Sequence, residues 1–462
     1  MAGQAYGYEN VNTVRIFGYA PGHAGEELVF YSWKDQISFT EKEIFRFQVD
    51  DNEEFFLEIE ISENPLYIFS YVGVYYLYMY IEPGNEYDIV IPDKVEKSPR
   101  EILNPYFEGV PTHIAVLNSD SAELNALIRD FDHMYEPLFG ETLLSLTGNN
   151  GRHLFDSIQI VFDHYFSNAN NPWFEIYTSY KFGLLKIFVQ LQTARSLSDN
   201  YFLFESVLYN NIAYMELFNQ VYNRYFLFFS RTVRGNRIFD DINRYQSYSR
   251  LRTTLQTDPV LGDGRLLELV ILKGLHDAFY ESDFSRSGLL IVLDSLAANT
   301  VYPEHRIISG NIRDKVTRLL TGFDPPGINL MNRTGEMVSL DDFRGYYVYL
   351  NFCTAASYSC LSEYGLLSRL RNNHGEYLKI VTVFIDESYE AMLEFLGKNN
   401  YEWDFLFYGN QPSVLKDYNI RMFPSYYLID RDGTMLMSPA PSPSEDFELY
   451  LFRTMRSRQE IR

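Results

Sequence analysis

The chain has two cysteines in 462 residues, and both lie in one short stretch, NFCTAASYSC, at residues 351–360. A deprotonated thiol is a strong nucleophile, so Cys353 and Cys360 are the first candidates for chemistry. They either react, singly or as a disulfide pair, or serve as small core residues. A disulfide requires Cα atoms within about 7 Å of each other, which depends on the elements around them. Two cysteines exclude a disulfide-rich scaffold.

The elements around the cysteines alternate between strand and helix patterns. After Pro325–Pro326, the sequence predicts a hairpin around Thr334–Gly335, a buried strand YYVYLNF, a helix from about Cys360, a buried strand LKIVTVFID, a helix MLEFLGKNN and a hairpin at Asp432–Gly433. This order favours an α/β layer with a partly parallel central sheet. Cys353 then shares a strand face with Asn351, because strand residues two apart point the same way.

The rest of the chain divides by its hydrophobic period. The first hundred residues alternate with period two, in runs such as EEFFLEIEI, which predicts an antiparallel β-sandwich with a turn at Pro83–Gly84. From about Glu101, segments such as GRLLELVILKGLHDAFY have helical spacing. We therefore predict a multidomain chain with a β-rich sandwich domain at 1–100, an α-helical domain at 101–322 and an α/β domain at 323–462.

Composition and charge exclude some classes of partner. The formal net charge of −23 disfavours nucleic acid, because phosphate binding needs clustered Lys and Arg. No apolar run reaches the ~20 residues that span a bilayer, and the first residues lack the features of an export signal. The sequence predicts no metal site and no cofactor.

Several motifs of the last 140 residues occur together in one known family. They are the entry turn at 322–326, SLDDFRGYYVYLNF, FIDESYEAMLEFL, the WDF at 403–405 and YNIRMFPSYYLIDRDG, which contains Pro424. With these motifs the segment resembles the thioredoxin-like domains of TlpA-like thiol-disulfide oxidoreductases, which are related to peroxiredoxins. The resemblance implies a thioredoxin-like fold for 323–462, with Pro424 as a cis-proline beside the active site. The whole arrangement is similar to that of Bacteroidetes-type envelope proteins, which implies a periplasmic or outer-envelope location, with the export signal or lipid anchor absent from this chain.

The resemblance also implies where the family's chemistry would lie. The family's active site reads Phe-Trp-Ala-x-Trp-Cys-x-x-Cys, and its first cysteine, at a helix N-terminus, forms the nucleophilic thiolate. Matching the second cysteine to Cys360 puts Ser357 at the nucleophile position, and Cys353 and Ala356 at the tryptophan positions. A serine needs an activating base to act as a nucleophile, and nothing in the sequence places His374 beside it. The peroxiredoxin pattern Thr-x-x-Cys likewise meets a serine at position 357. The implied site is therefore degenerate.

Two hypotheses remain for this site. In the first, the protein is a binding or scaffolding module that has lost dithiol exchange, and an extended polypeptide or an envelope protein binds along Phe423, Pro424 and Tyr358. In the second, it is a thiol-disulfide oxidoreductase that uses a shifted Cys353/Cys360 pair, or Cys360 alone. Both cysteines as inert core residues fit the first hypothesis.

Overall fold

The computed structural model describes residues 13–140, 145–147, 151–262, 264–386, 388–409 and 411–460. The chain forms two compact units. The first comprises 1–70, 77–93 and 112–313, and the second comprises 71–76, 94–111 and 314–462. The first unit thus holds most of the β-rich stretch together with the helical stretch, and the division into domains 1–100, 101–322 and 323–462 stays a prediction. No helix in the described ranges is both long and apolar enough to cross a membrane.

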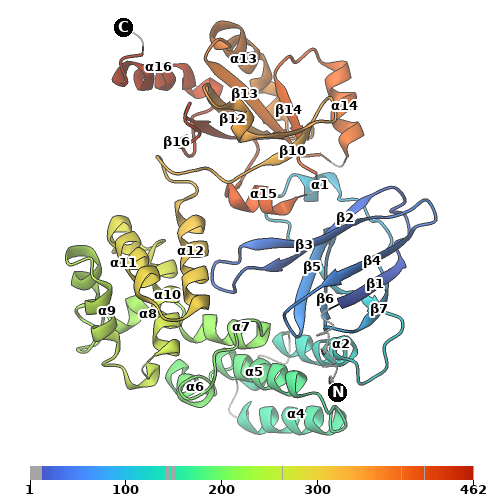
Figure 1. The fold of residues 1–462 in the computed structure, drawn as a ribbon, viewed down its shortest axis with the longest axis vertical. Helices are drawn as coiled ribbons and strands as arrows, with labels where there is room; N and C mark the ends of the chain where they lie inside the picture. The colour runs from blue at the N-terminus through green and yellow to red at the C-terminus, as the bar shows by residue number, and fades with distance from the viewer. Residues whose placement is uncertain are drawn as a thin grey trace, which may run out of the picture. The chain divides into compact units, whose positions relative to one another are not determined.

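The β-rich stretch forms two sheets (Figure 1), with strand orders β4-β1-β7-β9 and β3-β2-β5-β6-β8. The strands are β1 (Thr13–Tyr19), β2 (Glu27–Trp33), β3 (Glu41–Gln48), β4 (Glu54–Glu60), β5 (Leu66–Val72), β6 (Tyr75–Ile81), β7 (Glu86–Val90), β8 (Val110–His113) and β9 (Ala115–Val116). The turn predicted at Pro83–Gly84 joins β6 to β7, and Gly84 adopts φ 82° there. Residues 1–12 of the predicted sandwich lie outside the described residues.

Two expectations for this stretch are wrong in detail. The pair β1 and β7 is parallel rather than antiparallel. Five strands separate β1 from β7 in the sequence, so no hairpin forces the two strands to run in opposite directions. Continuous helical structure does not begin at Glu101 either. After the short α1 (Pro99–Ile102), residues 110–116 add β8 and β9 to the sheets before the first long helix. Strands of four and two residues are too short to show a clear period in the sequence.

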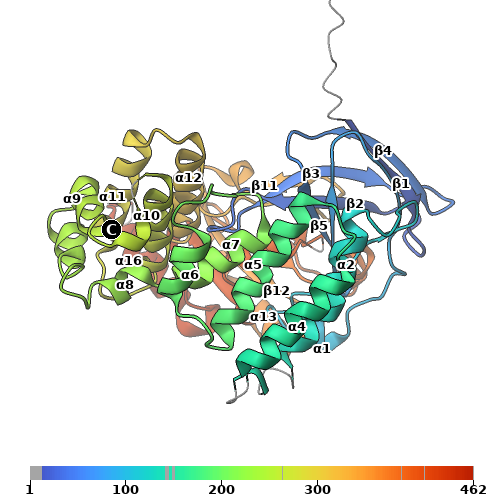
Figure 2. The same ribbon diagram turned by 90° about the horizontal axis from the view of Figure 1, so that it is seen from below.

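The helical stretch has an aromatic core. Its helices are α2 (Leu124–Tyr135), η1 (Glu136–Phe139), α4 (Gly151–Tyr165), α5 (Pro172–Phe188), α6 (Ala194–Tyr201), α7 (Ile212–Val221), α8 (Tyr225–Phe229), η2 (Asp240–Arg244), α9 (Tyr248–Leu255), η3 (Pro259–Leu261), α10 (Arg265–Ala278), α11 (Arg286–Asn299) and α12 (Pro303–Thr317). Figure 2 shows α2, α4 and α5 side by side, and the fully buried Phe131 of α2 contacts Phe162 of α4 and Phe182 of α5. Edge-to-face ring pairs of this kind stabilise the packing of these helices.

The α/β stretch has the predicted alternation of strands and helices (Figure 1). Its elements are β10 (Asn329–Asn332), β11 (Met337–Ser339), η4 (Leu340–Phe343), β12 (Tyr347–Cys353), α13 (Tyr358–His374), β13 (Leu378–Phe384), α14 (Tyr389–Lys398), β14 (Asp404–Phe407), α15 (Pro412–Asp417), β15 (Ser425–Ile429), β16 (Met435–Met437), η5 (Pro443–Glu445) and α16 (Phe447–Ser457). The described residues form one sheet in the order β11-β10-β14-β13-β12-β15-β16. Strands β12, β13 and β14 are parallel, and the other pairs are antiparallel. The sheet is therefore partly parallel, as the sequence predicted.

The central strand β12 separates two apolar cores. All seven of its residues are buried, and successive side chains point to opposite faces. Tyr347, Tyr349 and Cys353 join a core with residues of α13, α14 and α16, whereas the even-numbered residues 348, 350 and 352 join a core with residues of α15 and η4. Burial on both faces explains why β12 has a continuous apolar sequence rather than an alternating one. Cys353 therefore faces the helix that contains Cys360.

A chain of buried polar groups crosses the centre of this sheet. Asn351 is fully buried, donates from Nδ2 to the Val381 carbonyl at 3.1 Å, and accepts at Oδ1 from the Thr382 hydroxyl at 3.0 Å. Trp403 Nε1 donates to the same hydroxyl oxygen at 2.9 Å. Each of these side chains has at least one hydrogen-bond partner, as buried polar groups usually do. The polar chain fixes the side chains of β12 and β13 relative to Trp403.

Candidate functional site

Ser357 caps the N-terminus of α13. Its backbone is extended, with φ −94° and ψ 112°, and its side-chain oxygen accepts a hydrogen bond from the Cys360 N–H at 3.4 Å. Serine is among the best N-cap residues because its oxygen satisfies an amide that the helix leaves without a partner. The Ser357 hydroxyl donates in turn to the Phe423 carbonyl at 3.5 Å. Ser357 therefore joins the start of α13 to the loop that precedes β15.

The turn between β12 and Ser357 is held by the Asp386 carboxylate. The Ala355 N–H donates to Asp386 Oδ2 at 3.0 Å, and the Thr354 hydroxyl donates to Oδ1 at 3.3 Å. Because β12 and β13 are parallel neighbours, the residues after each strand lie at the same edge of the sheet. The sequence interpretation missed this role of Asp386. The signal that could have found it is a carboxylate placed directly after a buried parallel strand.

Cys353 and Cys360 lie together beneath this turn. Both are free thiols with no exposed surface, and both belong to the same buried core. Burial raises the pKa of the Cys353 thiol well above its ordinary value, and the neighbouring Cys360 adds to this. Burial opposes ionisation of Cys360 as well, but the neighbouring Cys353 thiol, the Thr354 backbone and the Ser357 side chain outweigh it, so the pKa of Cys360 is lowered. The structure brings the two cysteines together, and a disulfide between them stays a prediction.

The predicted binding residues lie close to Ser357. The Phe423–Pro424 peptide bond is cis, and the half-buried Phe423 ring packs against both cores of the sheet. Tyr358, the first residue of α13, is 84% exposed, and Met422, which precedes Phe423, is 68% exposed. Two large apolar side chains are thus presented to solvent next to the contact between Ser357 and Phe423.

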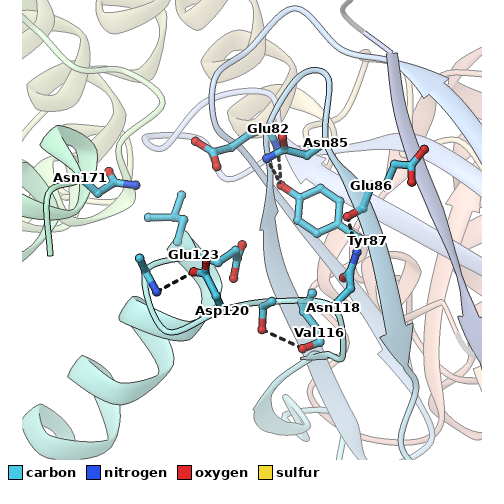
Figure 3. Close-up of a pocket in the computed structure, with 12 residues that line it drawn as sticks. Glu82, Asn85, Glu86, Tyr87, Val116, Asn118, Asp120, Glu123 and Asn171 are labelled. Carbon is cyan, nitrogen blue, oxygen red and sulfur yellow. Dashed lines mark hydrogen bonds between the residues drawn. The ribbon is translucent and has the colours of Figure 1, made fainter.

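A polar cavity of about 410 Å³ lies in the first unit (Figure 3). Its wall includes Glu82, Asn85, Tyr87, Asn118, Asp120 and Glu123. Several of these groups already hold the loop that leads to α2. Glu123 caps α2 by accepting from the Ala126 N–H at 3.1 Å, and Asn118 bonds the backbone of Asp88 and Glu86. Burial, and then the nearby Glu123, raise the pKa of Glu82. The main role of these polar side chains is therefore to hold the loop that precedes α2.

Comparison with known proteins finds relatives for about a third of the chain or less. No family model matches it. It is 25% identical over 154 residues to the thiol-disulfide oxidoreductase ResA of Bacillus subtilis, covering 33% of this chain and 82% of that protein. It is 24% identical over 115 residues to the thioredoxin-like protein YneN of Bacillus subtilis, covering 25% of this chain and 68% of that protein. The chain is a relative of the thioredoxin-like thiol-disulfide oxidoreductases.

A solved structure covers a similar share of the chain. The thioredoxin domain of a thiol-disulfide oxidoreductase from Bacteroides vulgatus is 25% identical, covers 29% of this chain and 96% of its own, and has a TM-score of 0.27. We call residues 323–462, which carry the motifs of this family, the thioredoxin-like segment.

His374, the nearest histidine in sequence to Ser357, is engaged elsewhere in the thioredoxin-like segment. It is the last residue of α13, roughly 25 Å along the helix from Ser357. Its Nδ1 is hydrogen-bonded to the Tyr377 hydroxyl at 2.6 Å, and its Nε2 is hydrogen-bonded to the Glu448 carboxylate. Ser357 therefore does not have His374 as an activating base.

The cap at Ser357 can be tested by substitution. Ser357→Ala removes the acceptor of the Cys360 N–H and should lower the opening free energy of the first turn of α13 by about 1 kcal/mol. Ser357→Asp keeps an acceptor and adds a negative charge at the helix N-terminus, so it should retain that free energy. Hydrogen–deuterium exchange of peptides that span α13 measures the change. The control is Ser362→Ala, whose hydroxyl donates to the Ser359 carbonyl on the exposed side of the helix. Equal losses in Ser357→Ala and Ser362→Ala would contradict the capping role.

Proposed function

We propose that the thioredoxin-like segment is a binding or scaffolding module for extended polypeptide chains. The observation that carries this proposal is that Ser357, rather than a cysteine, caps α13 beside the Phe423–Pro424 loop. A serine hydroxyl forms no disulfide and His374 does not activate it, so exchange at the surface position is lost. The surface around it remains suited to an apolar peptide, because Tyr358 and Met422 are exposed there.

The chemistry of this surface indicates which peptides would bind. Met and Tyr side chains contact apolar residues of varied shape, since the thioether is flexible and the phenol has a large flat face. Leu361, three residues along α13 from Tyr358, adds a third partly exposed apolar side chain on the same side of the helix. The surface would therefore bind an extended segment with apolar side chains, rather than a strongly charged one.

A second function, thiol-disulfide oxidoreductase, is favoured by one observation. Cys353 and Cys360 are both free thiols in the same core, so the two sulfur atoms that a dithiol needs for exchange with a disulfide are present together. The lowered pKa of Cys360 supports this role. Burial of both thiols opposes it, because a partner disulfide must reach the attacking sulfur. We rank it second for that reason.

We also propose a periplasmic or outer-envelope location for the protein, as the resemblance to TlpA-like proteins implies. This proposal predicts that the untagged protein is found in the envelope fraction of its native cells and is absent from the cytosolic fraction. Immunodetection after fractionation, with a cytosolic enzyme as the marker, measures it. Recovery of the protein together with that marker would rule the location out.

The binding surface is tested with an extended chain that carries no thiol, such as reduced and alkylated lactalbumin labelled with a fluorophore. Anisotropy titration should show saturable binding to the wild type. Tyr358→Ser and Met422→Ser should each raise Kd at least about fivefold, which corresponds to roughly 1 kcal/mol. The control is Tyr450→Ser on α16, where the tyrosine is 42% exposed and lies outside the proposed surface. Absence of saturable binding, or an equal loss in the control, would refute the proposal.

The proposed loss of thiol exchange at position 357 is tested by replacing Ser357 with cysteine. Wild-type protein should not reduce insulin disulfides, whereas Ser357→Cys should show weak but measurable activity. The new thiol would lie at the N-terminus of α13, one turn before Cys360, where the helix lowers its pKa below the ~8.5 of a free cysteine. Turbidity of insulin in dithiothreitol reports the activity.

The outcomes of this experiment separate the two functions. Wild-type turnover that is lost in Cys360→Ser would favour the oxidoreductase over the binding module. An inactive but folded Ser357→Cys protein would show that the site no longer supports exchange even with both sulfurs present.

A further inference from the structure

The stretch 224–252 is basic in an otherwise acidic chain. It contains seven arginines and two aspartates, with no lysine or glutamate, whereas the formal net charge of the whole chain is −23. It comprises α8, the loop 230–239, η2 and the first part of α9. Six of its arginines have exposed side chains, and these are Arg224, Arg231, Arg234, Arg237, Arg244 and Arg250. The net charge of the chain therefore does not describe this stretch.

Most of these exposed arginines lack an ion-pair partner. The Arg224 guanidinium pairs with the Glu281 carboxylate at 2.6 Å, and the Arg250 guanidinium pairs with the buried Asp241 at 3.2 Å. No ion pair in the described residues involves the other four, which are Arg231, Arg234, Arg237 and Arg244. Four positive charges are thus available to a partner of opposite charge.

The loop 230–239 is held by hydrogen bonds that leave its arginines at the surface. The Thr232 hydroxyl donates to the Phe229 carbonyl at 2.7 Å and accepts from the Gly235 N–H at 3.1 Å. A Cβ atom at Gly235 would clash with the same carbonyl, so only glycine fits there. The Arg234 guanidinium donates to the Thr257 carbonyl at 3.2 Å, which ties the loop to the end of α9. The loop is therefore ordered before any partner binds.

Carboxylates near the loop offset only part of this positive charge. Asp240, the first residue of η2, is exposed. Asp283 is also exposed and lies close to η2, because its backbone carbonyl accepts from the Asn243 side chain at 2.9 Å. Asp258, at the end of α9, is buried and lies 3.9 Å from the Arg195 guanidinium. Two exposed carboxylates face four unpaired guanidinium groups, so the surface is positive.

Exposed apolar and aromatic side chains lie among these arginines. Val233, in the middle of the loop, is 90% exposed, and Phe228, near the end of α8, is 56% exposed. The Arg231 guanidinium lies 5.9 Å from the centre of the Phe228 ring, and the Arg250 guanidinium lies 3.8 Å from the centre of the Tyr245 ring. Proteins that bind at a membrane surface combine cations with exposed apolar groups in this way.

We propose that the exposed side chains from Phe228 to Arg250, here called the arginine surface, bind the anionic headgroups of a lipid bilayer. A guanidinium forms paired hydrogen bonds to phosphate, and clusters of basic residues are attracted to anionic lipid surfaces. Val233 and Phe228 would enter the layer between the headgroups and the acyl chains. Nucleic acid offers phosphates but no apolar layer for Val233, so a bilayer matches the surface better. The inference uses neither the thioredoxin-like segment nor its proposed function.

The test is co-sedimentation of the full chain with vesicles. Wild-type protein should bind vesicles of phosphatidylglycerol and phosphatidylcholine in equal parts, but not vesicles of phosphatidylcholine alone. Raising NaCl from about 0.05 M to about 0.5 M should release it, because salt screens the attraction. The triple variant Arg231→Gln/Arg234→Gln/Arg237→Gln should lower the partition coefficient at least about tenfold. Val233→Ser, which changes no charge, should lower it about threefold, since an apolar group no longer enters the bilayer.

The matched control is Arg15→Gln/Arg46→Gln/Arg129→Gln. It removes the same number of charges from exposed arginines that already pair with carboxylates outside the arginine surface, and it should leave vesicle binding unchanged. An equal loss in this control would attribute binding to net charge and overturn the proposal. Absence of wild-type binding to the mixed vesicles, or unchanged binding in Val233→Ser, would overturn it as well. Tighter binding to a DNA duplex at the same phosphate concentration would instead assign the surface to nucleic acid.

Discussion

The hydrogen bonds from the turn at Thr354 and Ala355 to the Asp386 carboxylate fix where β12 ends and α13 begins. Every feature of the site depends on this junction. It ends the strand directly after Cys353, so that this sulfur stays in the core, and it places Ser357 at the first free amides of the helix. One helical turn then separates Ser357 from Cys360, so the position of the cap at the surface also fixes the position of the buried thiol.

The parallel pairing of β12 with β13 is what makes such a junction possible. Parallel neighbours end at the same edge of a sheet, so a residue that follows one strand can bond the backbone that follows the other. The Ile385 N–H donates to the Cys353 carbonyl at 2.8 Å, which continues the pairing up to the turn. An antiparallel partner would have presented its opposite end there. The site is thus a property of the sheet topology as much as of its own residues.

Much of the thioredoxin-like segment could be predicted because its elements have strong local signals. The continuous apolar run of β12 and the glycines at the two hairpins each specify structure within a few residues, and strand periodicity placed Cys353 on one face of the strand with Asn351. The same reasoning could not find the role of Asp386. That role depends on hydrogen bonds between residues that follow two separate strands, which no local period encodes. The short strands at 110–116 were missed for a related reason, since their pairing partners lie earlier in the chain.

Different physical requirements apply to Ser357, which caps a helix, and to the two sulfur atoms, which lie in the core. A helix N-terminus needs an oxygen acceptor, and serine supplies one without any redox chemistry. The core needs its polar groups paired, and a hydroxyl buried without a partner costs about 1–3 kcal/mol, a large share of a total stability of about 5–15 kcal/mol. Tyr364 and Tyr426 lie in the core with both cysteines, and neither hydroxyl has a hydrogen-bond partner among the described residues. Phenylalanine at these two positions would fill the same space without that cost.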